Sequence, residues 1–232
     1  MTFTSLASSS RGNCYVVSDG ETVILLECGI SFRRIKKELG FDLSAIRACL
    51  VSHEHKDHAK SVMDLIKSGV EVFASEETAE ALDCSFITPV EAGTQFSVGS
   101  FEVMPFRTWH DVKMSLGYLI YSRADGERLV FATDTVNLRH QFPGVNLLAL
   151  EANYDASILA RCERMPEKVR ERVTRTHMEI GTLCRYLETL DLSACRTLYL
   201  LHLSNASSNE GDFIERVRRV VPPNVHVIVC AE

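Results

Sequence analysis

Residues 52–58, which read Ser-His-Glu-His-Lys-Asp-His, constrain this chain more than any other segment. They place three of its eight histidines and one aspartate within six positions. The preceding residues 48–51 form a short apolar run, which predicts a buried strand that ends where the histidines begin. Imidazole nitrogens and a carboxylate presented by one turn suit a borderline divalent cation such as zinc. The segment therefore predicts a metal site with further ligands elsewhere in the chain.

Composition narrows the class of protein. The chain has 232 residues, of which 46% are hydrophobic and 24% charged, as in ordinary globular proteins. This length predicts a single domain over residues 1–232. No apolar run approaches the roughly 20 residues of a membrane span, and the N-terminus does not read as a secretory signal. We therefore expect a cytoplasmic protein that does not enter a membrane.

Cysteine usage and charge add two further limits. The eight cysteines are scattered without a Cys-x-x-Cys pair, which predicts reduced residues rather than disulfides or a zinc knuckle. The net charge of −6 argues against a surface coated for nonspecific binding to nucleic acid. It leaves a local basic groove open, because the field near a site depends on where the charges lie.

The order of the expected elements predicts the fold. Strands and helices alternate in the first 80 residues, several strands then follow one another, and helices and strands alternate again toward the C-terminus. The expected strands are 3–6, 14–17, 22–27, 48–51, 70–74, 95–98, 101–108, 117–122, 128–133, 146–151, 197–201 and 225–230. The expected helices are 31–39, 59–68, one from Ser75, 156–163, 166–174, 179–190 and 211–220. This pattern predicts an α/β (α+β) fold, a four-layer αββα sandwich.

Three further ligand-type residues follow expected strands. His110 comes after strand 101–108, Asp134 follows strand 128–133, and His202 follows strand 197–201. A carboxylate just past a buried strand needs a partner, and a cation is one. His140 and His226, in contrast, are expected on the surface and within the last strand, respectively.

The order of these residues resembles the ligand pattern of the metallo-β-lactamase superfamily. The resemblance rests on His53-x-His55-x-Asp57-His58 and on the three later ligands, and it extends over nearly the whole chain. It implies that His53, His55 and His110 hold one metal ion, and that Asp57, His58 and His202 hold a second, with Asp134 bridging both. It also implies the αββα fold and hydrolysis by a hydroxide that bridges the two ions, with Asp57 counted among the catalytic residues.

One departure from the family pattern precedes the first expected helix. Relatives usually have an aspartate, a small residue and a glycine where this chain has Glu27-Cys28-Gly29. Glu27 keeps the charge that supports the metal loop, but its extra methylene predicts a shifted backbone. We expect Cys28 to be a small buried residue and not a ligand.

The residues around the expected metals favour cleavage of phosphodiesters. The segment 148–154 resembles that of RNase Z-like enzymes, which implies that Glu151 pairs with His177 near the scissile phosphate. A glutamate partner raises the pKa of an imidazole and suits it to protonate a leaving alkoxide. The segments 8–15 and 201–205 resemble YycJ/WalJ-type 5′-to-3′ DNA exonucleases, although residues 176–179 differ from the histidine-leucine-serine motif that is usual in those enzymes. From these segments we predict substrate contacts at Arg11, Asn13, Ser204 and Asn205.

Two other activities stay open at this point. The first is a phosphodiesterase acting on a small cyclic nucleotide, whose ligands would look the same and which fits the acidic net charge. The second is a thioesterase of the glyoxalase II type, which usually appends a C-terminal helical domain. Zinc is the expected metal, with manganese or iron as alternatives for a carboxylate-bridged pair. The expected partner is DNA or a nucleotide phosphodiester, and the sequence does not indicate the oligomeric state.

Overall fold

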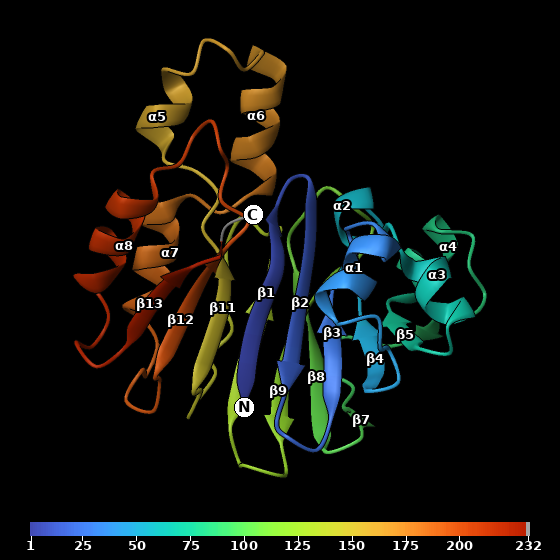
Figure 1. Cartoon of the computed structure of the whole chain (residues 1–232). Coiled ribbons are helices and arrows are strands. Elements are labelled where there is room, and N and C mark those ends of the chain that lie inside the picture. Colours follow the sequence, from blue (N-terminus) through green and yellow to red (C-terminus); the bar gives the residue numbers. More distant parts are fainter. Residues whose placement is uncertain (231–232) are drawn as a thin grey trace. The chain divides into compact units, whose positions relative to one another are not determined.

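The computed structural model describes residues 1–230 (Figure 1). They form two compact units: the first comprises residues 1–107 and 112–127, and the second comprises residues 108–111 and 128–230. The expectation that residues 1–232 are one domain stays a prediction.

A six-stranded sheet forms the larger part of the first unit. Its strands lie in sequence order, with β1, β2 and β3 antiparallel and β3 to β6 parallel. The strands are β1 (Thr2–Ser9), β2 (Gly12–Ser18), β3 (Val23–Leu26), β4 (Ile46–Leu50), β5 (Glu71–Ala74) and β6 (Thr88–Pro89). Leu25, Cys49 and Val72 on neighbouring parallel strands belong to one buried cluster, which also contains the cysteine Cys28. The prediction that Cys28 is buried is therefore confirmed.

The hairpin between β1 and β2 is tighter than the sequence predicts. Only Ser10 and Arg11 separate the two strands, so the expected polar turn over residues 7–13 is wrong in length. The polar side chains are accommodated inside the hairpin because they bond one another. The hydroxyls of Ser8 and Tyr15 are 2.8 Å apart, and the Tyr15 hydroxyl donates to Oδ1 of Asn13 at 3.1 Å.

Four helices connect the parallel strands of the first unit. They are α1 (Phe32–Glu38), α2 (Lys56–Ala59), α3 (Val62–Lys67) and α4 (Glu76–Ala81). Ser31 caps α1 and Ser75 caps α4 through their hydroxyls, as the sequence predicts. The single helix expected over residues 59–68 is wrong, because α2 starts three residues earlier and a break at Lys60–Ser61 precedes α3. Asp57 and His58 therefore lie in the first turn of α2.

Three more strands belong to the first unit: β7 (Phe96–Val98), β8 (Phe101–Thr108) and β9 (Ser115–Ser122), in the order β9-β8-β7. They contact the first sheet through buried side chains. The hydroxyl of Tyr118 on β9 donates to the carbonyl of Val51 at 2.6 Å, and the rings of Phe73 and Phe96 stack with centroids 4.9 Å apart. These contacts hold the residues after β4 in place.

The second unit has four parallel strands in sequence order (Figure 1, yellow to red). They are β10 (Arg128–Ala132), β11 (Leu147–Glu151), β12 (Thr197–Leu201) and β13 (His226–Val229). Its helices are α5 (Ala156–Ala160), α6 (Glu167–Thr176), α7 (Ile180–Leu187) and α8 (Glu210–Arg218). Every residue of β11 is buried, as expected for a parallel strand covered on both faces. Among the residues described, none of the helices is both long enough and apolar enough to cross a membrane.

Candidate metal centre

The first unit presents four of the expected ligands on residues 52–58, hereafter the histidine loop, which follow the end of β4. Nε2 of His53 lies 3.0 Å from Nδ1 of His55, and Nδ1 of His53 lies 2.8 Å from the hydroxyl of Ser52. The rings of His53 and His58 are also adjacent, with centroids 4.2 Å apart. Two imidazole nitrogens at this separation are arranged to share a cation.

Asn13 and Gly29 fix the path of the histidine loop. The side-chain amide of Asn13, which is fully buried, donates to the carbonyl of Asp57 at 3.2 Å and lies 3.3 Å from Nε2 of His58. Gly29 lies so close to the backbone of Asp57 that a Cβ atom on residue 29 would be 1.7 Å from the Asp57 carbonyl oxygen. Only glycine therefore allows the segment after β3 to pack against α2.

Glu27 also contacts the histidine loop, through both of its carboxylate oxygens. Its Oε1 accepts a hydrogen bond from the amide of Ser52 at 3.1 Å, and its Oε2 lies 3.4 Å from Nδ1 of His58. Glu27 is fully buried and has a left-handed backbone, with φ of 63°. Burial raises the pKa of Glu27 above its ordinary value, although His58 and the Ser52 amide oppose this shift. The carboxylate thus orients the imidazole that the resemblance names as a ligand.

The second unit gathers its acidic and imidazole side chains at one edge of the parallel strands. Asp134 follows β10, Glu151 is the last residue of β11, and His202 follows β12. Because parallel strands end at the same edge of a sheet, these side chains come together there. Asp134 and His202 have left-handed backbones, with φ of 46° and 55°. Such conformations are costly for residues other than glycine and are found mainly at functional sites.

His110 completes this cluster. Its Nδ1 lies 2.9 Å from the carbonyl of Thr176, which makes Nδ1 the protonated nitrogen of the neutral ring. The other nitrogen, Nε2, then faces the carboxylate oxygens of Asp134 at 3.5 Å and Asp111 at 3.1 Å. Lone pairs that converge in this way are stabilised by a cation between them, so the donors fit a metal ion.

Glu151 contacts His177, the last member of the cluster. Oε1 of Glu151 lies 2.6 Å from Nδ1 of His177, and the other oxygen accepts from the amides of Thr135 at 2.8 Å and Met178 at 3.2 Å. Burial acts to raise the pKa of Glu151, but the charge of His177 outweighs it and leaves that pKa below its ordinary value. Burial acts to lower the pKa of His177, and the two carboxylates Glu151 and Asp134 outweigh it, so that pKa is raised. The shared proton therefore belongs to the imidazole.

The structure thus brings together the predicted residues within each unit. His53, His55, Asp57 and His58 lie on the histidine loop of the first unit. In the second unit, Asp134, Glu151, His177 and His202 each offer one ligand atom, and these atoms all lie within 4.8 Å of one another. The contact of Glu151 with His177 is present, and the catalytic role that the resemblance implies for it stays a prediction.

The four predicted substrate contacts have different surroundings. Asn13 is buried against the histidine loop, whereas Arg11 is exposed at the tip of the β1–β2 hairpin. Ser204 and Asn205 follow His202, and Asn205 lines a hollow of about 600 Å³ together with two arginines, Arg161 and Arg164. Asn13 therefore positions ligands here, and the substrate contacts of all four residues stay predictions.

Sequence reasoning missed two residues that orient ligands. The amide nitrogen of Asn153 lies 2.8 Å from the carbonyl oxygen and 3.1 Å from Nδ1 of His202. Asp111 lies between His110 and the guanidinium of Arg172, with 2.8 Å separating its Oδ2 from Nε of Arg172. They follow the ends of expected strands by two and three residues, respectively, so the strand-end argument that identified Asp134 could have included them.

Comparison with known proteins agrees with this architecture. Residues 22–203 match the beta-lactamase superfamily domain. Exodeoxyribonuclease YycJ of Bacillus anthracis is 29% identical over 224 residues, which cover 87% of this chain and 82% of that protein. The metallo-β-lactamase fold protein YhfI from Bacillus subtilis superposes with a TM-score of 0.74 at 16% identity, covering 99% of this chain and 95% of YhfI. Zn²⁺-bound PqqB from Methylobacterium extorquens superposes with a TM-score of 0.73 at 13% identity, covering 100% of this chain and 99% of PqqB.

The chain belongs to the metallo-β-lactamase superfamily, and it is an enzyme of the hydrolase class. The predicted family and the predicted αββα fold class are therefore confirmed. The fold implies divalent metal ions, and the histidine and carboxylate clusters described above fit them.

Proposed function

We propose that this enzyme is a metal-dependent 5′-to-3′ DNA exonuclease. The observation that carries the proposal is the buried Glu151–His177 pair beside Asp134 and His202. A lactam or thioester hydrolase does not require a second imidazole held in protonated form, whereas a departing alkoxide benefits from a positioned proton. The likeness to an exodeoxyribonuclease over most of both chains supports the same activity.

The ligand assignment follows the family order. His53, His55 and His110 would hold one ion, and Asp57, His58 and His202 would hold the other, with Asp134 between them. Two bound divalent ions supply an activated water nucleophile and neutralise charge on the phosphate. Zinc fits the imidazole-rich donors, and manganese or iron also fits a carboxylate-bridged pair.

Side chains around the proposed metal ligands position these ligands and supply a proton. Glu27 and Asn13 hold the histidine loop, and Glu151 holds His177 with its proton on the imidazole. The His177 side chain is 14% exposed and that of Glu151 is fully buried, so His177 is the member of the pair that a substrate could contact. In the proposed reaction the imidazolium of His177 keeps its Nδ1 proton hydrogen-bonded to Glu151, donates its Nε2 proton to the leaving 3′ oxygen, and regains a proton from water afterwards. Arg11, Ser204 and Asn205 are proposed contacts to the phosphate and sugar, and a cytoplasmic location stays a prediction.

A degradation assay with blocked ends tests the activity. The metal-loaded protein is offered 5′-phosphorylated DNA with the 5′ or 3′ end blocked, RNA, a cyclic dinucleotide, a cyclic mononucleotide and a glutathione thioester. We expect nucleotides to be released from DNA, and a 5′ block to prevent their release. If the protein hydrolysed a cyclic nucleotide in preference to DNA, the proposed exonuclease activity would be wrong and the alternative, a phosphodiesterase acting on small cyclic nucleotides, would take its place. Hydrolysis of the thioester with every phosphodiester untouched would reject the proposal.

A further inference from the structure

Two hollows in the second unit have His110 in their lining. One, of about 270 Å³, is lined by His110, Asp111, Lys168, Arg172, Arg175 and Thr176. The other, of about 410 Å³, is lined by Trp109, His110, Val136, Asn137, Arg139 and Arg175. Because His110 and Arg175 line both, the hollows adjoin at an expected metal ligand, and together they are hereafter called the His110 groove.

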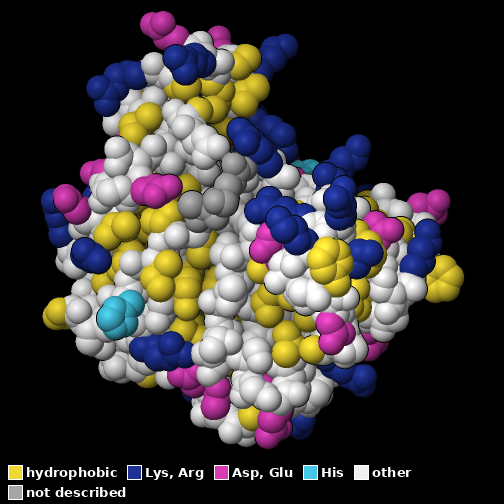
Figure 2. All heavy atoms as spheres, viewed as in Figure 1, with side chains coloured by type: hydrophobic (Ala, Val, Ile, Leu, Met, Phe, Trp, Pro, Cys, Tyr) yellow, Lys and Arg dark blue, Asp and Glu magenta, His cyan; other side chains and the backbone are white. Residues whose placement is uncertain are grey.

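The groove is basic although the chain as a whole is acidic. Residues 161–175 contain six Lys or Arg residues and three Glu residues, against a net charge of −6 for the chain. Lys168, Arg172 and Arg175 are spaced i, i+4 and i+7, which places them on one face of α6. Figure 2 shows Lys and Arg side chains gathered over α5 and α6. This distribution provides a local positive field that attracts phosphate groups.

The acidic partners of these cations do not cancel that field. Asp111 accepts from Arg172 at 2.8 Å and also faces Nε2 of His110 at 3.1 Å, so it neutralises Arg172 but not Lys168 or Arg175. Glu171 lies 3.4 Å from Arg175, and both side chains are largely exposed. An exposed pair of this kind contributes little, so a phosphate can replace the carboxylate of Glu171 on Arg175.

Trp109 provides an aromatic surface in the same groove. Its indole side chain is 40% exposed, whereas its backbone is fixed on both sides. The Trp109 amide donates to the hydroxyl of Thr135 at 3.0 Å, and its carbonyl accepts from the amide of Val136 at 3.1 Å. The ring lies 6.2 Å from that of His140, which was expected on the surface and is instead half-buried between Trp109 and Phe142. An exposed aromatic ring on a fixed backbone, in a hollow that also contains Arg139 and Arg175, suits stacking of a nucleobase.

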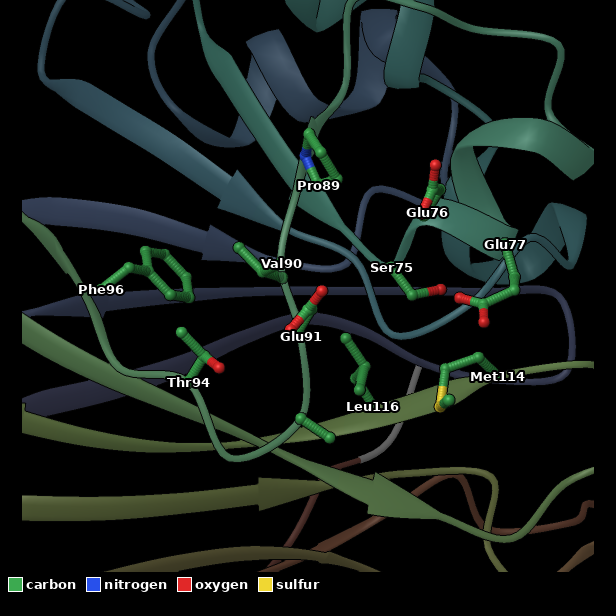
Figure 3. A pocket seen from close by; sticks show the side chains of 11 residues that line it. Ser75, Glu76, Glu77, Pro89, Val90, Glu91, Thr94, Phe96, Met114 and Leu116 are labelled. Carbon is green, nitrogen blue, oxygen red and sulfur yellow. The ribbon is translucent and has the colours of Figure 1, made fainter.

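A larger hollow in the first unit has the opposite character. It measures about 610 Å³ and is lined by Glu76, Glu77 and Glu91 together with apolar residues such as Phe96 and Met114 (Figure 3). Three carboxylates repel a phosphate backbone. Size alone therefore does not identify the nucleic-acid path, and charge favours the His110 groove over this hollow.

We propose that the His110 groove binds single-stranded DNA, with one base stacked on Trp109 and adjacent phosphates held by Arg139 and Arg175. This inference rests on the proposed nuclease function and adds the path of the strand beside the metal centre. Because His110 lines both hollows, a strand bound in the groove would lie beside an expected metal ligand. Bases of any identity can stack on an indole, so the contact favours degradation without sequence preference.

Intrinsic fluorescence tests the stacking directly, because Trp109 is the chain's only tryptophan. The metal-loaded protein is titrated with a phosphorothioate-linked thymidine decamer and, for comparison, with an abasic decamer of the same length. We expect the thymidine strand to quench Trp109 emission and the abasic strand to bind more weakly with little quenching. Saturating binding of the thymidine strand without any change in emission would overturn the inference.

Variants separate stacking from charge. Trp109→Ala should weaken binding of the decamer about 5- to 150-fold, whereas Trp109→Phe should retain most of it. Phe86→Ala, which removes an aromatic side chain that is 71% exposed in the first unit, is the matched control and should bind like the unchanged protein. Equal behaviour of Trp109→Ala and Phe86→Ala would reject the stacking role.

The salt dependence of binding tests the two arginines. Replacing Arg139 and Arg175 together by alanine should reduce the slope of log K against log salt by about 1.4, since each phosphate contact to a single strand contributes about 0.7. Arg218→Ala on the exposed face of α8 is the control, and its slope should not change. An unchanged slope in the double variant would overturn the phosphate contacts.

The outcomes also distinguish this inference from the proposed function. If the decamer quenches Trp109 but no phosphodiester is cleaved, the nuclease proposal fails and the binding groove stands. If DNA is degraded and Trp109→Ala keeps the KM of the unchanged protein, the groove fails and the nuclease proposal stands.

Discussion

Nδ1 of His177 lies 2.6 Å from Oε1 of Glu151, and the Glu151 side chain is fully buried. Two backbone amides hold the second oxygen of Glu151, so its carboxylate is fixed in orientation as well as in charge. The imidazole has fewer fixed contacts than the carboxylate and is partly exposed, which fits the proposal that Glu151 positions the proton and His177 delivers it.

Removing His177 should abolish most turnover while leaving the metals bound. A positioned general acid contributes about 10²- to 10⁴-fold to the rate, so we expect His177→Ala to lower kcat by this factor. Elemental analysis of the purified variant should still find both ions. Glu151→Gln should produce a smaller loss, because it keeps the imidazole but weakens its hold on the proton.

Two further variants calibrate this prediction. Asp134→Ala should lose metal, because its carboxylate is the proposed bridge between the ions. His226→Ala, which replaces an exposed histidine on β13, should change neither metal content nor kcat. Loss of metal from His177→Ala would instead identify His177 as a ligand, which its position beside Asp134 and His202 makes chemically feasible.

Glu27→Gln should weaken metal binding more than it weakens the chemical step. The carboxylate of Glu27 lies 3.4 Å from Nδ1 of His58 and orients that ring. Loss of such a support typically lowers metal affinity 10- to 100-fold. Competition with a chelator measures the affinity, and excess metal should restore kcat to near the original value. A kcat that stays low at saturating metal would show that Glu27 acts on the reaction itself.

Gly29→Ala should destabilise the protein strongly. The added Cβ would lie 1.7 Å from the carbonyl oxygen of Asp57, so the histidine loop would have to move. We expect a loss of about 3 kcal/mol in the free energy of unfolding, measured by urea denaturation, together with weaker metal binding. Gly211→Ala is the matched control, because its Cβ would have no neighbour closer than 3.5 Å and the residue lies in the first turn of α8. It should stabilise by about 0.5 kcal/mol, and similar effects at both glycines would contradict the packing argument.

Asp155 should make the stability of the second unit depend on pH. Burial opposes ionisation, but hydrogen bonds from Ser157 and Ile158 and the guanidinium of Arg216 lower the pKa of Asp155 to about 2. A lowered folded-state pKa means that the stabilisation is present above the unfolded pKa of about 4 and disappears as the pH falls toward 2. Asp155→Asn should therefore lower Tm by about 2–4 °C at pH 7, as expected for about 1 kcal/mol.

The same comparison at acid pH supplies the check. The difference in Tm between Asp155→Asn and the unchanged protein should shrink below pH 4 and be largely lost by about pH 2. Asp212→Asn, which removes an exposed partner of the same Arg216, should have little effect at any pH. A difference that keeps its full size at pH 2 would show that the effect does not depend on the charge of Asp155, since asparagine caps a helix about as well as aspartate.

The sequence predicts the strand-end residues well because local pattern determines them. Asp134 and His202 each follow an apolar run that forms a strand. Because these strands are parallel, the residues after them lie at the same edge of the sheet, whatever the path of the connecting segments. The β1–β2 hairpin was predicted with too long a turn, because the bond between Ser8 and Tyr15 satisfies polar groups in a way that residue type does not reveal. The start of α2 was missed for a similar reason, since its four residues have no helical period to detect.

The His110 groove marks the limit of such prediction. The i, i+4, i+7 spacing of Lys168, Arg172 and Arg175 can be read from the sequence, but it is typical of any solvated helix face. Its significance depends on α6 ending beside His110, where Thr176 accepts from the imidazole. That proximity joins residues 66 positions apart, and no local pattern encodes it.

Glu27, Asp134 and His202 all have the left-handed backbone that glycine adopts without strain. Each such residue costs on the order of 1 kcal/mol, so the unreactive replacement is also the more stable one. A directed-evolution screen that selects only for survival of heating should therefore enrich glycine at these positions. Thermostable variants obtained in that way would tend to lose the side chains that hold and orient the metals. Engineering of this enzyme for heat resistance needs selection for turnover in the same round.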